Sequence, residues 1–331
     1  MPTLYVVEQG AQIAKRGERL VVRRGPDTIA SVPIHRVDQV VLLGRVNPTT
    51  PAVDLLLRHE VPVFYMAQYG ALKGVLMPPV GKNILLRRAQ FRRADDADFS
   101  LRVARAMVHA KVINQRAYCL RWRRDHGVDA SREADRQLAR VLRQMGNADA
   151  GALMGFEGAA AKAYYVALRE LLSQKMVFER RTRRPPEDPV SALLGFASAL
   201  LRAQVFAAVS LVGFDPYLGF HHTQKYGRPA LVLDLMEEFR PIIADATATA
   251  VINFRIIDET DFERHGGALL MTEAAIERFV AAFDRRLRTE VTHPITGTRL
   301  SYRQCIELQA RMLAKAVRGE IPGYLGFATE H

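Results

Sequence analysis

The chain has 331 residues, and 49% of them are hydrophobic, which is enough to bury a sizeable core and excludes disorder as a global state. Lysine and arginine number 47 against 35 acidic residues, and the resulting net charge of +12 favours a polyanionic partner such as nucleic acid. We find neither a secretory signal nor an apolar run approaching the roughly 20 residues that span a bilayer, so we expect a cytoplasmic protein with no membrane partner.

Residues 1–83 are predicted to form a small, β-rich N-terminal domain. Short β-branched runs, such as residues 4–7 and 40–43, are separated by turn residues, as is typical of strands. Thr49 is expected to cap one short helix whose first position is near Pro51. These features predict a β-sandwich or split barrel with one helix. We find no catalytic constellation in it, so a role in dimerisation or docking is expected.

Residues 84–331 show helical apolar spacing and are predicted to form a larger, all-α catalytic domain, which makes the fold class α+β. Residues 99–124 and 190–212 are expected to be long helices, the second of them largely buried. Two amphipathic helices are predicted near the end of the chain, at residues 272–289 and 300–318.

Basic residues are concentrated in the first part of this helical domain. Residues 87–143 hold 15 basic and 7 acidic residues. Some of these side chains are expected to be solvated helix surface. Others surround Trp122, the only tryptophan, and could line a phosphate-binding face: Arg121, Arg123 and Arg124.

Residues 213–241 are the most informative segment of the chain. They contain two adjacent histidines on a turn-rich stretch and three acids after a short apolar run: His221, His222, Asp234, Glu237 and Glu238. On a helix, Asp234 would share a face with Glu237 and Glu238, and such carboxylates repel one another unless a cation or a proton lies between them. Together with an imidazole nitrogen they would suit manganese or magnesium. The segment therefore predicts a metal site, with a solvated helix face as the alternative.

Positive charge flanks these acids. Lys225, Arg228 and Arg240 bracket them, and a site that combines a metal with basic side chains suits a phosphodiester substrate. Glu157 is a further candidate acid, because it lies between Phe156 and Gly158 in a run of small residues. It could equally be a first-turn carboxylate that is favoured by the helix dipole.

With these residues in place, the chain resembles the CRISPR-associated integrase of spacer acquisition, a metal-dependent DNA endonuclease, over nearly its full length. The resemblance is strongest over residues 213–220, His222, residues 227–229 and residues 234–241. It also includes Glu157 with its neighbouring small residues, Tyr164, and Arg183 and Arg184 before two prolines.

The resemblance implies specific metal ligands. By position, the catalytic ligands of a magnesium or manganese ion are Glu157, His222 and Glu237, with Asp234 beside them as an auxiliary acid. His221 stands where the family usually has an apolar residue, so it is not the expected ligand, although the histidine doublet leaves its role open.

The resemblance also implies a reaction and partners. The 3′-hydroxyl of a captured double-stranded DNA fragment would attack a phosphorus at the CRISPR repeat by transesterification. The expected nucleic-acid contacts are Lys225, Arg228, Tyr164, Arg183 and Arg184. The family works as a homodimer that binds a small CRISPR-associated partner protein, and a second copy of the dimer completes a hetero-hexamer.

Two other functions remain as alternatives. A non-catalytic, basic nucleic-acid-binding protein would keep every activity when Glu157 is replaced by alanine. A metal-dependent hydrolase of small phosphorylated substrates would not bind DNA tightly at moderate salt.

Overall fold

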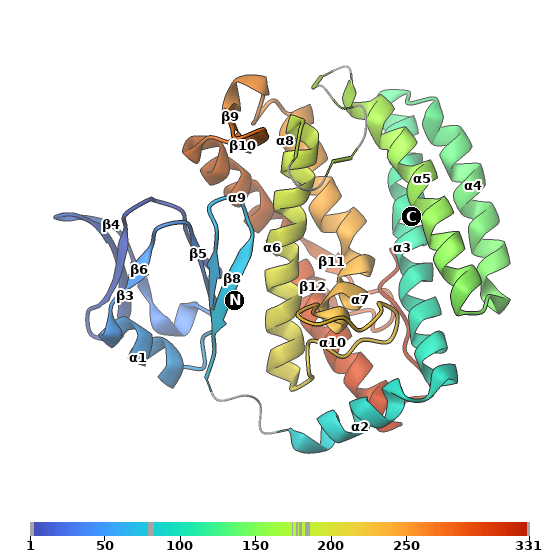
Figure 1. Cartoon of the computed structure of the whole chain (residues 1–331), viewed down its shortest axis with the longest axis horizontal. Coiled ribbons are helices and arrows are strands. Elements are labelled where there is room, and N and C mark those ends of the chain that lie inside the picture. The colour runs from blue at the N-terminus through green and yellow to red at the C-terminus, as the bar shows by residue number, and fades with distance from the viewer. Residues whose placement is uncertain are drawn as a thin grey trace.

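The structure is a computed structural model that describes residues 3–78, 83–173, 175–176, 178, 181–182 and 186–329. The predicted DNA contacts Arg183 and Arg184 lie outside these residues. A β-rich N-terminal part precedes a larger, mostly helical part, so the predicted α+β class is confirmed (Figure 1). The last N-terminal strand ends at Leu76 and the first helix of the larger part begins at Ile84, while the domain boundary at residue 83 stays a prediction.

The N-terminal part contains two four-stranded sheets and one helix. In one sheet the strand order is β1-β5-β7-β8, in which β7 and β8 are antiparallel and the other pairs are parallel. The order in the other sheet is β4-β3-β2-β6. The elements are β1 (Thr3–Val6), β2 (Gln12–Lys15), β3 (Arg19–Arg24), β4 (Asp27–Pro33), β5 (Gln39–Leu43), β6 (Asn47–Pro48), α1 (Thr50–Arg58), β7 (Val63–Met66) and β8 (Leu72–Leu76), with a 3₁₀ turn at Ile34–Arg36.

Strand β5 connects this part to the rest of the molecule. All five of its residues are buried. Because successive side chains of a strand point to opposite faces, Val40 and Leu42 join a small core with α1 and the second sheet. Val41 and Leu43 join the large core of the helical part. The first sheet is therefore covered on both faces.

The helical part is organised around the long helices α3 and α6, with α4 and α5 stacked on the outer side of α3 (Figure 1). Its helices are α2 (Ile84–Ala94), α3 (Ala97–His126), α4 (Ala130–Gln144), α5 (Ala150–Ser173), α6 (Pro189–Val212), α7 (Ala230–Phe239), α8 (Ala246–Asn253), α9 (Glu273–Arg288) and α10 (Tyr302–Arg318), with 3₁₀ turns at Met145–Asn147 and Glu259–Asp261. Two short hairpins are formed by β9 (Phe262–His265) with β10 (Ala268–Met271) and by β11 (Glu290–Thr292) with β12 (Arg299–Ser301).

Two features of this part differ from the sequence prediction. The hairpins were not predicted, because strands of three or four residues are too short to show a clear alternation. The strongly apolar sequence of residues 242–257 predicts one core helix, but the chain forms a π-helical segment, Arg240–Asp245, followed by α8 (Ala246–Asn253). Proline has no N–H for the α-helical ladder, so the regular hydrogen-bond pattern of α7 ends here.

Helix α6 is long and apolar enough to cross a membrane by length and composition, contrary to the expectation that no segment comes close. However, 72% of its most apolar stretch is buried within the protein. Phe206 packs edge-on against Phe64 of β7, and Gln204 hydrogen-bonds the hydroxyls of Thr3 and Tyr5. Helix α6 is therefore the central core helix between the sheet and the other helices.

Candidate active site

The loop that joins α6 to α7 is organised by the carboxylate of Asp234, which is fully buried. Its Oδ2 accepts the backbone N–H groups of Phe220 (2.6 Å) and His221 (3.0 Å). Its Oδ1 accepts the backbone N–H of His222 at 2.8 Å and lies 2.7 Å from Nδ1 of the same residue. A Cβ at Gly219 would lie 2.4 Å from Oδ2, so only glycine fits there. The backbone conformation of this loop therefore depends on hydrogen bonds to a single side chain, the carboxylate of Asp234.

The same loop is also fixed to α2. Gln90, which is fully buried, donates from Nε2 to the carbonyl oxygens of Asp215 (2.9 Å) and Leu218 (2.7 Å). Its Oε1 accepts the backbone N–H of Asp215 at 2.8 Å. Three hydrogen bonds from one side chain therefore hold the loop in place without any regular secondary structure.

Two of the predicted ligands, Glu157 of α5 and Glu237 of α7, come together around a lysine. The Nζ of Lys111, on α3, lies 2.6 Å from Oε1 of Glu157 and 2.6 Å from Oε2 of Glu237. The Lys111 and Glu237 side chains are only 7% and 6% exposed, so solvent screens these contacts weakly. Arg240 adds a second cation, with its Nη1 3.1 Å from Oε1 of Glu237.

The two adjacent histidines contact different acids, Glu157 and Asp234. Nε2 of His221 lies 2.9 Å from Oε2 of Glu157, whereas Nδ1 of His222 bonds Asp234. The two rings are 5.3 Å apart and nearly perpendicular. His222 therefore has the arrangement of a metal-ligating histidine, in which a carboxylate holds one ring nitrogen and leaves the other available. The structure nevertheless places His221, and not His222, against Glu157.

The electrostatics of this cluster keep its acids ionised. Burial alone would raise the pKa of Glu157, but His221 and the Lys111 ammonium hold it well below its usual range. Burial acts in the same direction on Glu237, yet Arg240 and Lys111 lower its pKa to about 2. The pKa of Lys111 is raised, because Glu237 and Glu157 outweigh its burial.

These residues fit a divalent cation in their chemistry. Carboxylate oxygens with an imidazole nitrogen suit magnesium or manganese, and Glu157 and Glu237 already share one positive group. In the arrangement described, no three His, Cys, Asp or Glu side chains of the described residues are grouped closely enough to hold a metal. The positive group that lies between Glu157 and Glu237 in this arrangement is the Lys111 ammonium.

The remaining predicted site residues lie in three different environments. Lys225 is exposed and lines a hollow of about 400 Å³ at the edge of the loop, beside Tyr217 and Tyr226, and Arg228 is half-buried nearby in the sequence. Tyr164 is fully buried and its ring packs on that of Trp122, 5.2 Å away, so its predicted contact with nucleic acid does not suit this structure.

Glu238 does not join Asp234 and Glu237 at the site, although helical spacing suggested a shared face. Its buried carboxylate faces the C-terminal tail, where it accepts hydrogen bonds from the Tyr324 hydroxyl (2.6 Å), the Phe327 N–H (2.7 Å) and Gln309 (3.0 Å). Glu238 therefore fixes the tail against α7.

Sequence reasoning missed Lys111, and it gave Arg240 only a general flanking role. Lys111 lies one helical turn before Asn114, whose side chain also binds the tail through the Phe327 carbonyl, but a lysine in a basic helix carries no signal by itself.

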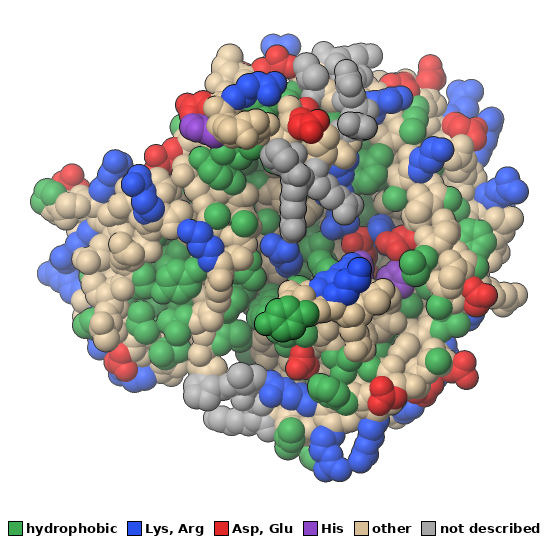
Figure 2. Space-filling view, viewed as in Figure 1, with side chains coloured by type: hydrophobic (Ala, Val, Ile, Leu, Met, Phe, Trp, Pro, Cys, Tyr) green, Lys and Arg blue, Asp and Glu red, His purple; other side chains and the backbone are tan. Residues whose placement is uncertain are grey.

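Figure 2 shows the site on the surface of the molecule. Acidic and histidine side chains gather in a hollow between α6 and α5, and basic side chains lie at its edge.

Comparison with known proteins identifies relatives along the whole chain. The family model described as "CRISPR associated protein Cas1" matches residues 4–285. A Cas4/Cas1 fusion of Geobacter sulfurreducens, named as an exonuclease and endonuclease, is 38% identical over 98% of this chain, but the chain spans only 60% of that protein. A CRISPR-associated endonuclease Cas1 of Rhodospirillum rubrum is 36% identical and is matched over 97% of this chain and 96% of its own length.

Solved structures share the fold. A casposase bound to an integration product superposes with a TM-score of 0.84 at 21% identity, over 99% of this chain and 94% of that one. A Cas6-RT-Cas1–Cas2 complex gives a TM-score of 0.82 at 22% identity, and the match covers 99% of this chain and 36% of that one.

Proposed function

This chain belongs to the family of CRISPR-associated Cas1 proteins, and we propose that it is a metal-dependent DNA endonuclease and integrase that inserts captured DNA fragments into a CRISPR array. The observation that carries the proposal is the convergence of Glu157 and Glu237, which come from helices distant in sequence, on one buried positive group beside two histidines. Two buried, ionised carboxylates cost free energy unless a cation pairs with them, so we expect this site to hold a cation.

The site would hold magnesium or manganese through Glu157, His222 and Glu237. When bound, the ion supplies Lewis-acid stabilisation of the charge that develops on a phosphodiester. Asp234 accepts a hydrogen bond from Nδ1–H of His222, which would leave Nε2 with its lone pair for a ligand bond. Glu157 and Glu237 contribute ionised oxygens, because their neighbours keep both pKa values low.

The surrounding residues would bind and orient the DNA. The attacking group is a 3′-hydroxyl of the captured fragment. Its oxygen would form a new bond to a phosphorus at the edge of the repeat while the bond from that phosphorus to the 3′-oxygen of the flanking strand breaks. The hydroxyl proton is lost and the leaving oxygen ends as a 3′-hydroxyl, so no protein nucleophile is needed. Lys225 and Arg228 are near the histidine loop and can neutralise flanking phosphates. His221 would keep Glu157 oriented through its 2.9 Å contact.

The proposed partners follow the family. We expect double-stranded DNA as substrate, a homodimer, and a small CRISPR-associated partner protein that completes a hetero-hexamer in the cytoplasm. The integration product in the similar casposase supports DNA as the substrate, and the Cas1–Cas2 complex among the similar structures supports a CRISPR-associated partner.

A DNA-joining assay tests the function. A short duplex with free 3′-hydroxyl ends would be incubated with a supercoiled plasmid carrying a CRISPR repeat, with Mn²⁺ or Mg²⁺, and with the partner protein present or absent. We expect metal-dependent joining or nicking by the wild type and a loss of at least about 100-fold in Glu157→Gln, since a ligand oxygen and its charge are removed.

Glu133→Gln is the matched control, because it makes the same change on the exposed face of α4 and should keep full activity. DNA binding without joining or cleavage by the wild type, with the partner present, would instead support the non-catalytic binding protein.

A further inference from the structure

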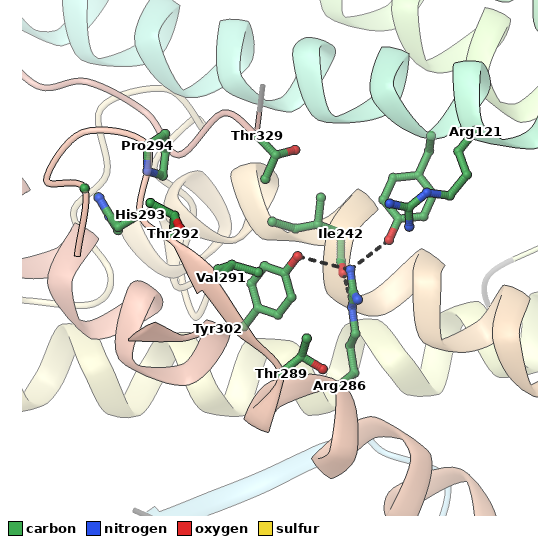
Figure 3. A pocket seen from close by; sticks show the side chains of 12 residues that line it. Arg121, Ile242, Arg286, Thr289, Val291, Thr292, His293, Pro294, Tyr302 and Thr329 are labelled. Carbon is green, nitrogen blue, oxygen red and sulfur yellow. Dashed lines mark hydrogen bonds between the residues drawn. The ribbon is translucent and has the colours of Figure 1, made fainter. Parts of the chain in front are cut away.

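A second cavity lies on a different part of the helical domain from the candidate active site. It has a volume of about 610 Å³, within the range of small-ligand pockets. Helix α3, the C-terminal end of α9, the β11–β12 hairpin, the start of α10 and the C-terminal tail line it (Figure 3). None of the predicted metal ligands contributes to its wall.

Arg286 is the central cation of this cavity, and it has no acidic partner among the described residues. Its Nε donates to the carbonyl oxygen of Ile242 (2.7 Å), and its Nη2 to the hydroxyls of Tyr118 (2.9 Å) and Tyr302 (3.2 Å). Its Nη1 makes no hydrogen bond to a described residue, nor is it one of the fully buried unpaired atoms. Figure 3 shows the Arg286 guanidinium hydrogen-bonded to the hydroxyl of Tyr302.

The two hydroxyls add donors to the same space. Each accepts a hydrogen bond from Arg286 and so keeps its own O–H proton for another acceptor, and no such acceptor is found among the described residues. Burial raises the pKa of Tyr118, which keeps it a donor at neutral pH. Arg121 lies over the Tyr118 ring, 5.5 Å from its centre, at the exposed edge of the cavity.

The acids close in sequence to Arg121 and Arg286 pair with other arginines. Asp125, one turn after Arg121, pairs with Arg124 at 2.7 Å, and Asp284, near Arg286 in the sequence, pairs with Arg303 at 2.9 Å. Asp245 influences Tyr118 electrostatically, but burial raises the pKa of its carboxyl. The cavity therefore presents an excess of hydrogen-bond donors and positive charge.

We propose that this cavity, formed by Arg286, Arg121 and the hydroxyls of Tyr118 and Tyr302, is an anion site that binds a phosphate group. A guanidinium with a free donor edge, together with two hydroxyl donors, matches the oxygens of a phosphate. The phosphate would come either from a free nucleotide or from the backbone of a DNA strand. The second source rests on the proposed function, whereas the first does not.

Calorimetric titration of the full chain tests the site, with inorganic phosphate, 5′-deoxyadenylate and a short single-stranded oligonucleotide as probes at constant ionic strength. Trp122, the only tryptophan, lies 5.9 Å from the Tyr118 ring, so its fluorescence reports on the location of binding. We expect saturable binding of at least one probe, weakened about tenfold or more in Arg121→Gln and in the double variant Tyr118→Phe/Tyr302→Phe. These changes leave Arg286 and the packing of the rings in place.

Arg102→Gln is the matched control, since Arg102 is exposed on the same helix but does not line the cavity. Binding of phosphate or deoxyadenylate would assign the site to a free nucleotide, and binding of the oligonucleotide alone would assign it to DNA. Equal affinities in the wild type and both cavity variants, or no binding of any probe, would overturn the proposal. DNA joining is measured separately, so a failure of the proposed function would show as lost joining with unchanged phosphate binding.

Discussion

Lys111 is the residue whose position says most about the site. Its ammonium is 2.6 Å from each of two carboxylates that sequence reasoning assigned to a metal. Without a cation between them, the two ionised carboxylates of Glu157 and Glu237 would repel each other. We infer that Lys111 compensates the charge of the two acids in this arrangement, and that a divalent ion held by the same carboxylates would take over this role.

The variant Lys111→Met tests this role. Removing one partner of a buried ion pair leaves an uncompensated charge and typically costs about 3–5 kcal/mol, so we expect a loss of stability of this order in EDTA. Mn²⁺ should restore stability more in the variant than in the wild type, because the ion takes over the missing charge. Denaturant unfolding with and without Mn²⁺ measures both effects.

Lys175→Met serves as the control, because Lys175 is exposed and its ammonium bonds, among the described residues, only the neutral side chain of Asn253. If Lys111→Met were as stable as the wild type in EDTA, Lys111 would not be the group that compensates the acids.

Glu238 predicts a pH dependence. Burial raises its pKa to about 7, although the Phe327 N–H, Tyr324 and Gln309 oppose this. The folded protein therefore keeps the carboxyl protonated at pH values where the unfolded chain, with a pKa of about 4.3, has ionised. The contribution of the Glu238 carboxyl to the free energy of unfolding is fully present below about pH 4, and it is lost as the pH rises through 7.

Glu238→Gln cannot ionise and should lack this loss. Relative to the wild type, the variant should gain up to about 3 kcal/mol in free energy of unfolding between pH 5 and pH 8. Urea unfolding in EDTA at several pH values measures the difference, and parallel curves for the two proteins would show that the folded-state pKa of Glu238 is not raised.

At the scale of elements, the loop between α6 and α7 depends on the first turns of α7. Asp234 receives three backbone N–H groups and the His222 ring, and every one of these groups is a donor. In Asp234→Asn only one side-chain oxygen remains as an acceptor, so the amide NH₂ group would face backbone N–H groups that also donate. The ordered conformation of the loop and the orientation of the His222 ring therefore both depend on the Asp234 carboxylate.

Asp234→Asn should lower the affinity for Mn²⁺ about 10- to 100-fold, the range found for partners that orient a metal-ligating histidine. We also expect faster proteolysis within the loop. Manganese titration and limited proteolysis follow the two effects, with exposed Asp98→Asn of α3 as the control. Unchanged manganese affinity would mean that the orientation of His222 does not matter for the ion.

The helices were predictable from sequence where local signals marked their ends. The helix predicted at residues 272–289 is α9, which Thr272 caps through its Oγ1, and Asp188 with Pro189 begins α6. The paired contacts of the site were less predictable, because Lys111 and Glu157 are 46 residues apart and lie on different helices. Glu238 shows the limit of helical spacing, since one residue after Glu237 the side chain already faces the C-terminal tail.

At the scale of the whole molecule, positive charge should govern DNA binding. With a net charge of +12, a duplex would be held mainly through its phosphates. For about six to ten phosphate contacts, affinity should fall roughly 10³- to 10⁵-fold between 50 and 200 mM salt. Fluorescence anisotropy over this range measures the slope, and an affinity that does not depend on salt would contradict backbone-dominated binding.

The central claim is that Glu157 and Glu237 together hold a divalent ion. Manganese titration followed by electron paramagnetic resonance tests it most directly, with the wild type compared with Glu157→Gln/Glu237→Gln. We predict one saturable Mn²⁺ per wild-type chain and no saturable binding in the double variant. Equal Mn²⁺ binding by both proteins would contradict the claim and would place the metal elsewhere in the molecule.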